Sequence, residues 1–325
     1  MATPVTVTTG ARLHFGPLVA AGSSGGKFGG VGMMISAPGY VVTARPAEQD
    51  SFVGDEASVA RVAEFVRRIR AASSGGAKVA PCEIDVRKAI PSHSGLGSGT
   101  QLGLAVARAL SELSGERDVP VETLARRAGR GLRSAIGLHG FARGGFLVDG
   151  GRADQRDQLG TLVARYDFPP DWRLILASPP QSSGLSGEAE LRAFAAQPPM
   201  SSALTGELCR IVLMDWLPAV IEADFARVSA AMYEFGLAVG HFFEPVQGGV
   251  FAHPRMARLV EQLRTRGVSG IAQTSWGPTL AVLCASAAEA HQLANDCAHG
   301  GDWSDCEFRV VEPLNRGAAA CVERS

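Results

Sequence analysis

The sequence predicts an α+β protein in two halves. Short segments with alternating apolar residues, typical of strands, open the chain and recur along it. Amphipathic helical segments separate them. The proline-rich piece DFPPDW at 167–172 lies between two glycine-rich blocks, and a helix does not continue through it. We therefore divide the chain into predicted domains at 1–165 and 166–325, with the second suited to an α+β layer.

The first half is predicted to begin with strands and then to alternate. Val5, Val7, Leu13 and Phe15 indicate opening strands, interrupted by a glycine-rich stretch at 22–32. The further elements expected are a strand at 39–45, a helix at 56–72, a strand within 82–90, a helix ending near 113 and a helix at 120–133.

The second half is expected to contain a strand at 172–178, a loop at 179–202 and helices near 206–221 and 223–239. A β-α-β-α-β order then follows, with segments at 246–252, 254–266, 278–284, 286–299 and 306–312. The alternating strands of this half make a homodimer plausible.

Composition and charge favour a small molecule as the partner. Of the 325 residues, 46% are hydrophobic, which is enough to bury a large core. Lys and Arg number 31 against 32 Asp and Glu, so the net charge of -1 provides no basic field for nucleic acid or an anionic membrane. We expect neither of these as a partner.

The cysteines and the apolar runs indicate a cytoplasmic protein. The six cysteines are scattered without a C-x-x-C pair or metal-ligand spacing, so we expect reduced, mostly buried thiols. The first residues lack a basic segment followed by an apolar one. No uninterrupted apolar run approaches the roughly 20 residues that span a bilayer.

The strongest local signal is PSHSGLGSGTQ at 91–101, between a predicted strand and an amphipathic helix. Gly95, Gly97 and Gly99 let backbone N–H groups converge, and the helix N-terminus adds partial positive charge, so an anion fits within 90–101. The segment is neither a Walker A loop, because the Lys is absent, nor a Rossmann fingerprint. A glycine-rich turn with capping serines is the alternative. Side chains of the loop that would contact phosphate oxygens are Ser94, Ser98, Thr100 and Gln101.

The loop pattern P-x-x-x-G-L-G-S resembles the phosphate loop of the GHMP kinases, the galactokinase and mevalonate kinase superfamily. Further blocks resemble the β-ribofuranosylaminobenzene 5′-phosphate synthase family within it, almost from end to end. These blocks are GARLHFG at 10–16, GGVGMMI at 29–35, RSAIGLHGFARGGFLVDGG at 133–151, VQGGVFAHP at 246–254 and AQTSWGPT at 272–279. The resemblance implies a GHMP-kinase-like two-lobed fold. Its N-terminal lobe would contain a βαβ unit and the phosphate loop, and its C-terminal lobe would be a ferredoxin-like α/β sandwich.

This resemblance also implies a reaction. The family makes a C-riboside from 4-aminobenzoate and phosphoribosyl pyrophosphate, releasing carbon dioxide and pyrophosphate, in tetrahydromethanopterin biosynthesis. We expect Mg²⁺ to assist departure of the pyrophosphate. Loss of carbon dioxide restores aromaticity in the ring, so no organic cofactor is expected. The acceptor is open to a close analogue such as 4-hydroxybenzoate.

Two other functions are weighed against this transferase. An ATP-dependent small-molecule kinase would need the catalytic Asp that lies a few residues before a Gly-Gly pair in mevalonate kinase-like proteins, but Gly137 occupies that position. A non-catalytic protein that binds a nucleotide or a sugar phosphate is the other alternative. The block at 272–279 favours the transferase, because a generic sugar kinase is not expected to carry it.

Candidate site residues come from these blocks. The predicted catalytic residues are Arg12, His14, His93, Arg133 and Gln273. Predicted to bind phosphate or substrate are the loop residues named above together with Lys27, Ser134, His139, Arg143, Gln247, Thr274, Ser275 and Trp276. Asp149 is the candidate metal ligand, with a turn residue as its alternative. Lys27 and His93 are open to solvated roles, and Trp276 to packing.

Overall fold

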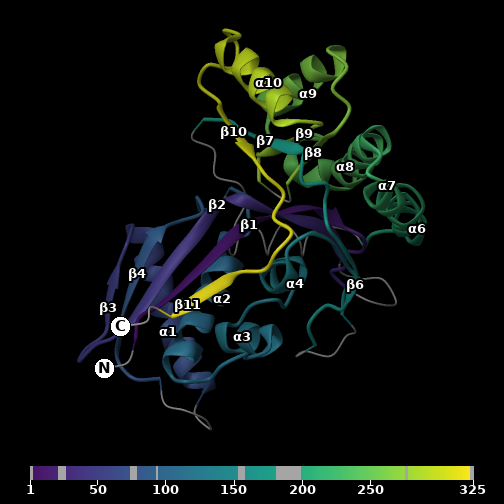
Figure 1. Ribbon diagram of the computed structural model, residues 1–325. Helices are drawn as coiled ribbons and strands as arrows, with labels where there is room; N and C mark the ends of the chain where they lie inside the picture. Colours follow the sequence, from purple (N-terminus) through teal and green to yellow (C-terminus); the bar gives the residue numbers. More distant parts are fainter. Residues whose placement is uncertain are drawn as a thin grey trace.

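The computed structural model describes residues 3–20, 27–73, 79–92, 94–152, 158–180, 199–274 and 277–322. Figure 1 shows two lobes, each built on its own sheet and each carrying its own helices. The predicted α+β class and the GHMP-kinase-like two-lobed fold are confirmed.

The first lobe is a seven-stranded sheet in which β11-β1-β2-β4-β3 pair in that order and β5 and β6 extend from β2. All of its ladders are antiparallel except that between β3 and β4. Its strands are β1 (Val5–Pro17), β2 (Gly30–Pro46), β3 (Ser51–Val53), β4 (Cys82–Lys88), β5 (Phe146–Asp149), β6 (Leu162–Tyr166) and β11 (Ala319–Val322).

Strand β2 is longer than the strand expected at 39–45. It already begins at Gly30, within the glycine-rich stretch that we expected to separate the strands. Val31, Met33 and Ile35 are fully buried, and the whole strand pairs with β1 through bulges. The apolar residues, rather than the neighbouring glycines, therefore determine where the strand starts.

Helices of the first lobe pack around α2, which contacts both β1 and β2. They are α1 (Glu56–Ala72), α2 (Ser98–Leu113), α3 (Val121–Ala128) and α4 (Ile136–Arg143). The expected helix at 56–72 is confirmed, and the Asp55 carboxylate caps its N-terminus by accepting from Ser58 N–H. Helix α3 ends well before residue 133, because Gly129 adopts a left-handed conformation with φ 64° and terminates it.

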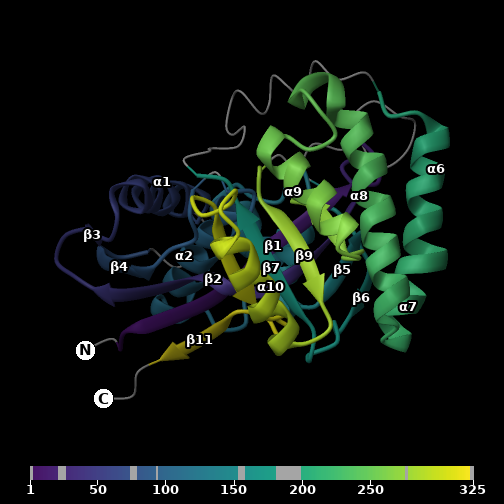
Figure 2. The ribbon, with the colours of Figure 1, turned by 90° about the horizontal axis from the view of Figure 1, so that it is seen from above.

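In the second lobe the sheet order is β10-β7-β9-β8, antiparallel throughout, which is the ferredoxin-like arrangement. Its strands are β7 (Arg173–Ser178), β8 (Ile271–Gln273), β9 (Leu280–Cys284) and β10 (Glu307–Val311). Its helices are α6 (Ser202–Arg210), the π-helical turn η1 (Ile211–Trp216), α7 (Leu217–Glu222), α8 (Phe225–Gln247), α9 (Pro254–Thr265) and α10 (Ala287–His299). Figure 2 shows α6, α7 and α8 together along one side of this lobe.

The strand expected at 246–252 is wrong. Helix α8 continues past Pro245 to Gln247, and residues 248–253 form no regular element. Burial of Phe235, Val239 and Phe243 along one face extends the helix beyond the expected end at 239. The missing strand is instead β8, a three-residue strand too short for alternation to reveal.

The two lobes share a core. The ring of Trp216 lies 5.1 Å from the rings of Phe15 and Phe146, and 5.6 Å from that of Phe235, measured between centroids. The tail beyond β10 also returns to the first lobe, where β11 pairs with β1 (Figure 1). Residues on both sides of position 166 therefore belong to one core. The predicted domain bounds, 1–165 and 166–325, stay a prediction.

All six cysteines are unpaired, and four of them are buried, as expected. Burial raises the pKa of the Cys82 thiol to about 11 and that of Cys284 to about 12. Among the described residues, no helix combines the length and the apolar character needed to cross a membrane.

Candidate active site

The glycine-rich loop leads from β4 into α2, and its backbone explains its composition. Gly95 and Gly97 have φ of 78° and 74°, a left-handed conformation that L side chains rarely adopt. Gly97 immediately precedes α2, and Leu96 between the glycines is buried. The loop therefore presents the N-terminus of a sixteen-residue helix, where backbone N–H groups and the helix dipole favour an anion.

The second lobe supports this loop directly. The Thr279 hydroxyl donates to the carbonyl oxygen of Ser94 at 3.1 Å. A Cβ added to Gly95 would lie 2.7 Å from Thr274 Oγ1, and one added to Gly277 would lie 2.7 Å from the Ser94 oxygen. Thr274, Gly277 and Thr279 of the predicted block at 272–279 thus pack on the phosphate loop. Its members Ser275 and Trp276, and His93 within the loop, lie outside the described residues.

Arg12 on β1 extends its side chain onto the same loop. Its backbone N–H donates to Leu96 O at 3.0 Å, and its Nη1 donates to Gly95 O at 3.3 Å. A Cβ on Gly97 would come within 3.2 Å of the Arg12 Cβ, so the absence of a side chain there leaves room for the arginine. The guanidinium therefore lies next to the loop, where it could contact an anion bound there.

His14 lies two residues along the same strand and is 7% exposed. Its Nε2 is 3.1 Å from Ser134 Oγ. A Cβ on Gly30 would lie only 2.9 Å from this nitrogen, so the neighbouring strand makes room for the ring by having glycine there. Burial, and secondarily the Arg12 charge, hold the pKa of His14 well below its usual value of 6.5, which favours the neutral imidazole at pH 7.

Asp149, at the end of β5, is fully buried next to Ser134, the residue that His14 contacts. Its Oδ2 accepts from Ala135 N–H at 2.6 Å and from the Ser134 hydroxyl at 3.5 Å, while Oδ1 accepts from Gly151 N–H at 2.9 Å. Burial raises the pKa of Asp149, although these hydrogen bonds oppose the rise. The described residues contain no group of three or more metal-ligating side chains, and the role of Asp149 as a metal ligand stays a prediction.

Two arginines that sequence reasoning missed converge on the first turn of α2. A Cβ on Gly99 would lie 2.6 Å from Arg130 Nη2 and 3.1 Å from Arg61 Nη2. Nη1 of Arg61 reaches the hydroxyls of Ser92 and Ser98 at 3.4 and 3.5 Å. Arg130 lies just beyond the end of α3, and its side chain folds back toward the Phe65 ring.

Two residues that were predicted to bind substrate, Gln101 and His139, form hydrogen bonds with other protein groups instead. The side chain of Gln101 is fully buried, accepts from the Thr9 hydroxyl at 2.6 Å and donates to Gly137 O at 2.9 Å. His139 on α4 contacts Gly160 O through Nε2 at 2.9 Å. Both side chains join α4 to its surroundings, so they support the site from behind.

Gln247 and Gln273 contact each other across the start of the irregular segment 248–253. Gln273 Nε2 donates to Gln247 Oε1 at 3.3 Å, and its Oε1 accepts from Ala252 N–H at 2.6 Å. Gln247 Nε2 donates to Val250 O at 2.9 Å. In the structure these amides fix the path of that segment.

The remaining predicted residues are dispersed. The backbone of Lys27 pairs with that of Arg152, close to Gly151. Thr100 lies in the first turn of α2, where its N–H donates to Gly97 O. Arg133 and Arg143 are exposed, and Arg143 is at the opposite end of α4 from Ser134, about 12 Å away along the helix axis.

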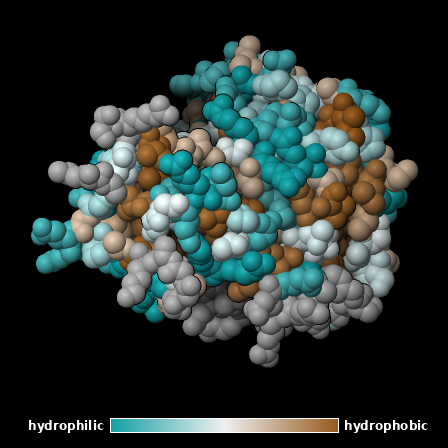
Figure 3. Space-filling view, turned by 60° about the horizontal axis from the view of Figure 1, so that its bottom comes forward, coloured by the Kyte–Doolittle hydropathy of each residue, from teal (hydrophilic) through white to brown (hydrophobic). Residues whose placement is uncertain are grey.

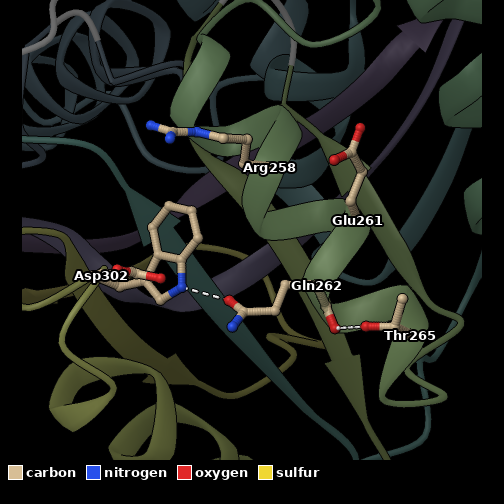
Figure 4. Close-up of a pocket in the computed structure, with 6 residues that line it drawn as sticks. Arg258, Glu261, Gln262, Thr265 and Asp302 are labelled. Atoms are coloured by element: carbon tan, nitrogen blue, oxygen red, sulfur yellow. Dashed lines mark hydrogen bonds between the residues drawn. The ribbon is translucent and has the colours of Figure 1, made fainter.

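An open pocket of about 530 Å³ lies elsewhere, between α9 and the segment before β10 in the second lobe (Figure 4). It is lined by Arg258, Glu261, Gln262, Thr265, Asp302 and Trp303. Gln262 is engaged with Trp303 Nε1, which donates to its Oε1 at 2.5 Å. None of the predicted site residues lines this pocket, so we place the site at the phosphate loop, where the glycines, arginines and buried polar groups meet.

The fold and the loop define a protein of the GHMP kinase class. Residues 57–144 match the GHMP kinases N terminal domain and residues 216–301 match the GHMP kinases C terminal family. Homoserine kinase from Cytophaga hutchinsonii has the same fold, with a TM-score of 0.65 and 17% identity over 99% of this chain and 98% of that one. Mevalonate pyrophosphate decarboxylase from Streptococcus pyogenes gives 0.66 and 13% over 97% and 98%.

Sequence relatives narrow the class to one family. The chain is 30% identical to the beta-ribofuranosylphenol 5'-phosphate synthase of Methanothermobacter thermautotrophicus, over 86% of this chain and 88% of the relative. It is 35% identical to the Archaeoglobus fulgidus enzyme of that name, over 69% and 72%. The chain therefore belongs to the beta-ribofuranosylphenol 5'-phosphate synthase family of enzymes, which confirms the predicted resemblance.

Proposed function

We propose that this enzyme transfers the phosphoribosyl group of phosphoribosyl pyrophosphate to 4-aminobenzoate with loss of carbon dioxide and pyrophosphate. The product is β-ribofuranosylaminobenzene 5′-phosphate, for tetrahydromethanopterin biosynthesis. The observation that carries this proposal is the position of Arg12, whose side chain lies against the Gly95–Gly97 turn beside the N-terminus of α2. An arginine beside the N-terminus of a helix is an arrangement that favours binding of a phosphate group.

The proposed reaction has no need of an organic cofactor. The bond between the anomeric carbon and oxygen breaks, and pyrophosphate leaves with the electron pair. The ring carbon that bears the carboxylate then forms a bond to the anomeric carbon with π electrons that the amino group in the para position makes available. Finally the bond to the carboxylate breaks, carbon dioxide leaves, and its bonding electrons restore the aromatic ring.

The protein's contribution is to stabilise the negative charge that develops on the leaving group. Arg12, Arg61 and Arg130 surround the loop and the first turn of α2. Mg²⁺ would be bound by the pyrophosphate itself and would supply further charge neutralisation there. The Asp149 carboxylate accepts hydrogen bonds from two backbone N–H groups and from the Ser134 hydroxyl. These contacts suit a carboxylate with a structural role in the site better than one that binds the metal ion.

The kinase alternative is opposed by the surroundings of Gly137. This residue is buried on α4, and its carbonyl oxygen accepts from Gln101 Nε2 at 2.9 Å. A Cβ there would lie 3.1 Å from Thr100 Cγ2. A side chain at this position would press on the Thr100 methyl group, and glycine provides no carboxylate, so phosphoryl transfer would lack the group that orients its nucleophile.

The acceptor is either 4-aminobenzoate or 4-hydroxybenzoate. Both carry an electron-donating group opposite the carboxylate, so both suit the same chemistry. The archaeal relatives are named for a phenol product. We retain 4-aminobenzoate as the proposed acceptor and make the other an arm of the test.

The test incubates the purified protein with Mg²⁺, phosphoribosyl pyrophosphate and either carboxyl-labelled acid, and counts released carbon dioxide. We expect release that requires both substrates and does not require ATP. Release of carbon dioxide from 4-hydroxybenzoate but not from 4-aminobenzoate would show that 4-hydroxybenzoate is the acceptor. Absence of release from both acids, together with ATP consumption on a panel of sugars and alcohols, would refute the transferase and support the kinase.

We further propose a homodimer in the cytoplasm. Leu213, Met214 and Ile221 on η1 and α7 are more than half exposed, and apolar side chains gathered on one surface mark sites of protein association. Figure 3 shows apolar surface gathering on the right of the molecule, the side on which α6 and α7 lie in Figure 1. Light scattering of the wild type and of Met214→Glu would test the assembly, and a monomeric wild type would refute it.

A further inference from the structure

The polar groups beneath β1 form a chain from Asp149 through Ser134 to His14. Their separations are 3.5 Å between Asp149 Oδ2 and Ser134 Oγ, and 3.1 Å between Ser134 Oγ and His14 Nε2. The residues come from β5, the turn before α4 and β1, so only the tertiary structure brings them together. The order of donors along this chain determines which nitrogen of His14 carries its proton.

The Ser134 hydroxyl has one proton to donate and can accept two hydrogen bonds. It accepts from Ile136 N–H at 3.3 Å, and it donates to the Asp149 carboxylate, the stronger acceptor of its two neighbours. Its remaining lone pair faces His14 and requires a donor. The neutral imidazole therefore carries its proton on Nε2.

His14 Nδ1 is then a bare acceptor. It is buried, and no hydrogen-bond partner for it exists in the part of the chain that the structure describes. A buried acceptor without a donor is costly, since desolvation is not compensated. Such an atom, on the same strand as the arginine that contacts the loop, points to a ligand group that donates a hydrogen bond.

We propose that Ser134 and Asp149 are positioning residues that fix His14 as the Nε2–H tautomer, so that Nδ1 accepts from a ribose hydroxyl of phosphoribosyl pyrophosphate. The choice of group follows from chemistry. Phosphates and the carboxylate of the acceptor only accept hydrogen bonds, whereas the sugar hydroxyls and the amino group of the acceptor donate. Of these donors, the sugar hydroxyls belong to the molecule whose phosphates would bind at the loop that Arg12 contacts. This assignment rests on the proposed function for the identity of the sugar, but the tautomer itself does not.

The spacing on β1 agrees with a sugar ring. Arg12 and His14 are two residues apart with no bulge between them, so their side chains leave the same face of the strand about 7 Å apart. Arg12 contacts the phosphate loop. A donor at His14 is thus about one sugar ring away from phosphate bound at the loop.

The first experiment records ¹⁵N spectra of the histidine side chains in the ligand-free protein, with His14 assigned by its absence in His14→Gln. His139 is an internal reference, because its Nε2 contacts a carbonyl oxygen and must carry a proton. We expect His14 to share the Nε2–H pattern of His139. Protonation of His14 at Nδ1 would overturn the proposal, whatever reaction the enzyme performs.

The positioning role is tested with Ser134→Ala, which removes the hydroxyl and keeps the backbone. We expect the His14 resonances to change toward the other tautomer while those of His139 stay in place, with thermal unfolding as a check on folding. An unchanged His14 spectrum would show that Ser134 does not set the tautomer. Asp149→Asn provides a second variant, expected to shift His14 in the same direction.

The binding role is tested with phosphoribosyl pyrophosphate and its 2-deoxy and 3-deoxy analogues. The wild type should bind one analogue about three- to tenfold more weakly, the effect of a lost hydrogen bond between neutral groups. His14→Ala should lose this discrimination. Equal discrimination by both proteins would overturn the assignment, whereas failure of the wild type to bind phosphoribosyl pyrophosphate would refute the proposed function and leave the tautomer result standing.

Discussion

At the scale of the residue, Arg12 and His14 show how one strand provides two kinds of recognition. They leave the same face of β1, yet one is a permanent cation against the phosphate loop and the other a neutral ring held below it. The charge of Arg12 contributes to keeping His14 neutral. A substitution at either position should therefore affect a different part of the substrate.

Replacing Arg12 with Ala should weaken binding of phosphoribosyl pyrophosphate about ten- to a hundredfold, because a charge-assisted contact is lost. Isothermal titration calorimetry measures the change. Arg126→Ala is the control, since Arg126 is exposed on α3. Affinity equal to the wild type in Arg12→Ala would move the phosphate site away from this loop.

The lowered pKa of His14 predicts a pH-dependent stability. Below pH 6.5 the unfolded chain binds a proton that the folded protein excludes, so the free energy of unfolding falls as the pH falls through this range. The slope for one such group approaches about 1.4 kcal/mol per pH unit. Denaturant unfolding between pH 7.5 and 5.5 should show a steeper loss in the wild type than in His14→Gln, with exposed His241→Gln resembling the wild type.

At the scale of the element, the phosphate loop owes its shape to both lobes. Its own glycines permit the left-handed turns, and Thr274, Gly277 and Thr279 contact it from the second lobe. The block AQTSWGPT was identified as characteristic of the family, but its contact with the loop was not predicted. Ser94 and Thr279 are 185 positions apart in sequence, and no local pattern indicates that they touch.

Comparing Gly95→Ala with Gly115→Ala distinguishes the effect of backbone strain from the effect of the contact between the loop and Thr274. Both glycines have a left-handed φ, of 78° and 82°, so both variants should lose about 1–2 kcal/mol of stability. A Cβ at Gly95 would also meet Thr274 at 2.7 Å, whereas nothing lies within 4 Å of one at Gly115. Unfolding and substrate titrations should therefore show a greater loss of stability, and weaker binding, only for Gly95→Ala. If both variants lost the same stability and bound substrate equally well, the contact between Thr274 and the loop would have no role in either property.

At the scale of the whole molecule, a single aromatic cluster joins the lobes. Trp216 is 1% exposed and touches aromatic rings of β1, β5 and α8. Its indole N–H has no hydrogen-bond partner among the described residues. Packing alone therefore holds this ring, and the two lobes should unfold together.

Trp216→Ala should destabilise the protein by about 3–5 kcal/mol, the usual cost of emptying a buried aromatic site. Trp216→Phe retains most of the volume and removes the unpaired N–H, so it should cost much less. Calorimetry measures both, and we expect one transition in the wild type. Two well-separated wild-type transitions would show that the lobes are independent domains after all.

The sequence by itself determined the class of fold, the phosphate loop and the family, because these depend on local periodicity, on glycine and on contiguous motifs. In β1 the two-residue period of a strand places Arg12 and His14 on one face, because no bulge lies between them. The tertiary structure alone decided which polar groups meet: Arg61 and Arg130 at Gly99, Thr274 at Gly95, and Asp149 with Ser134 beneath His14. It also decided that Gln101 and Gln273 contact protein groups. The physical reason is that the partner of a buried polar group is set by packing between distant segments, which no local pattern records.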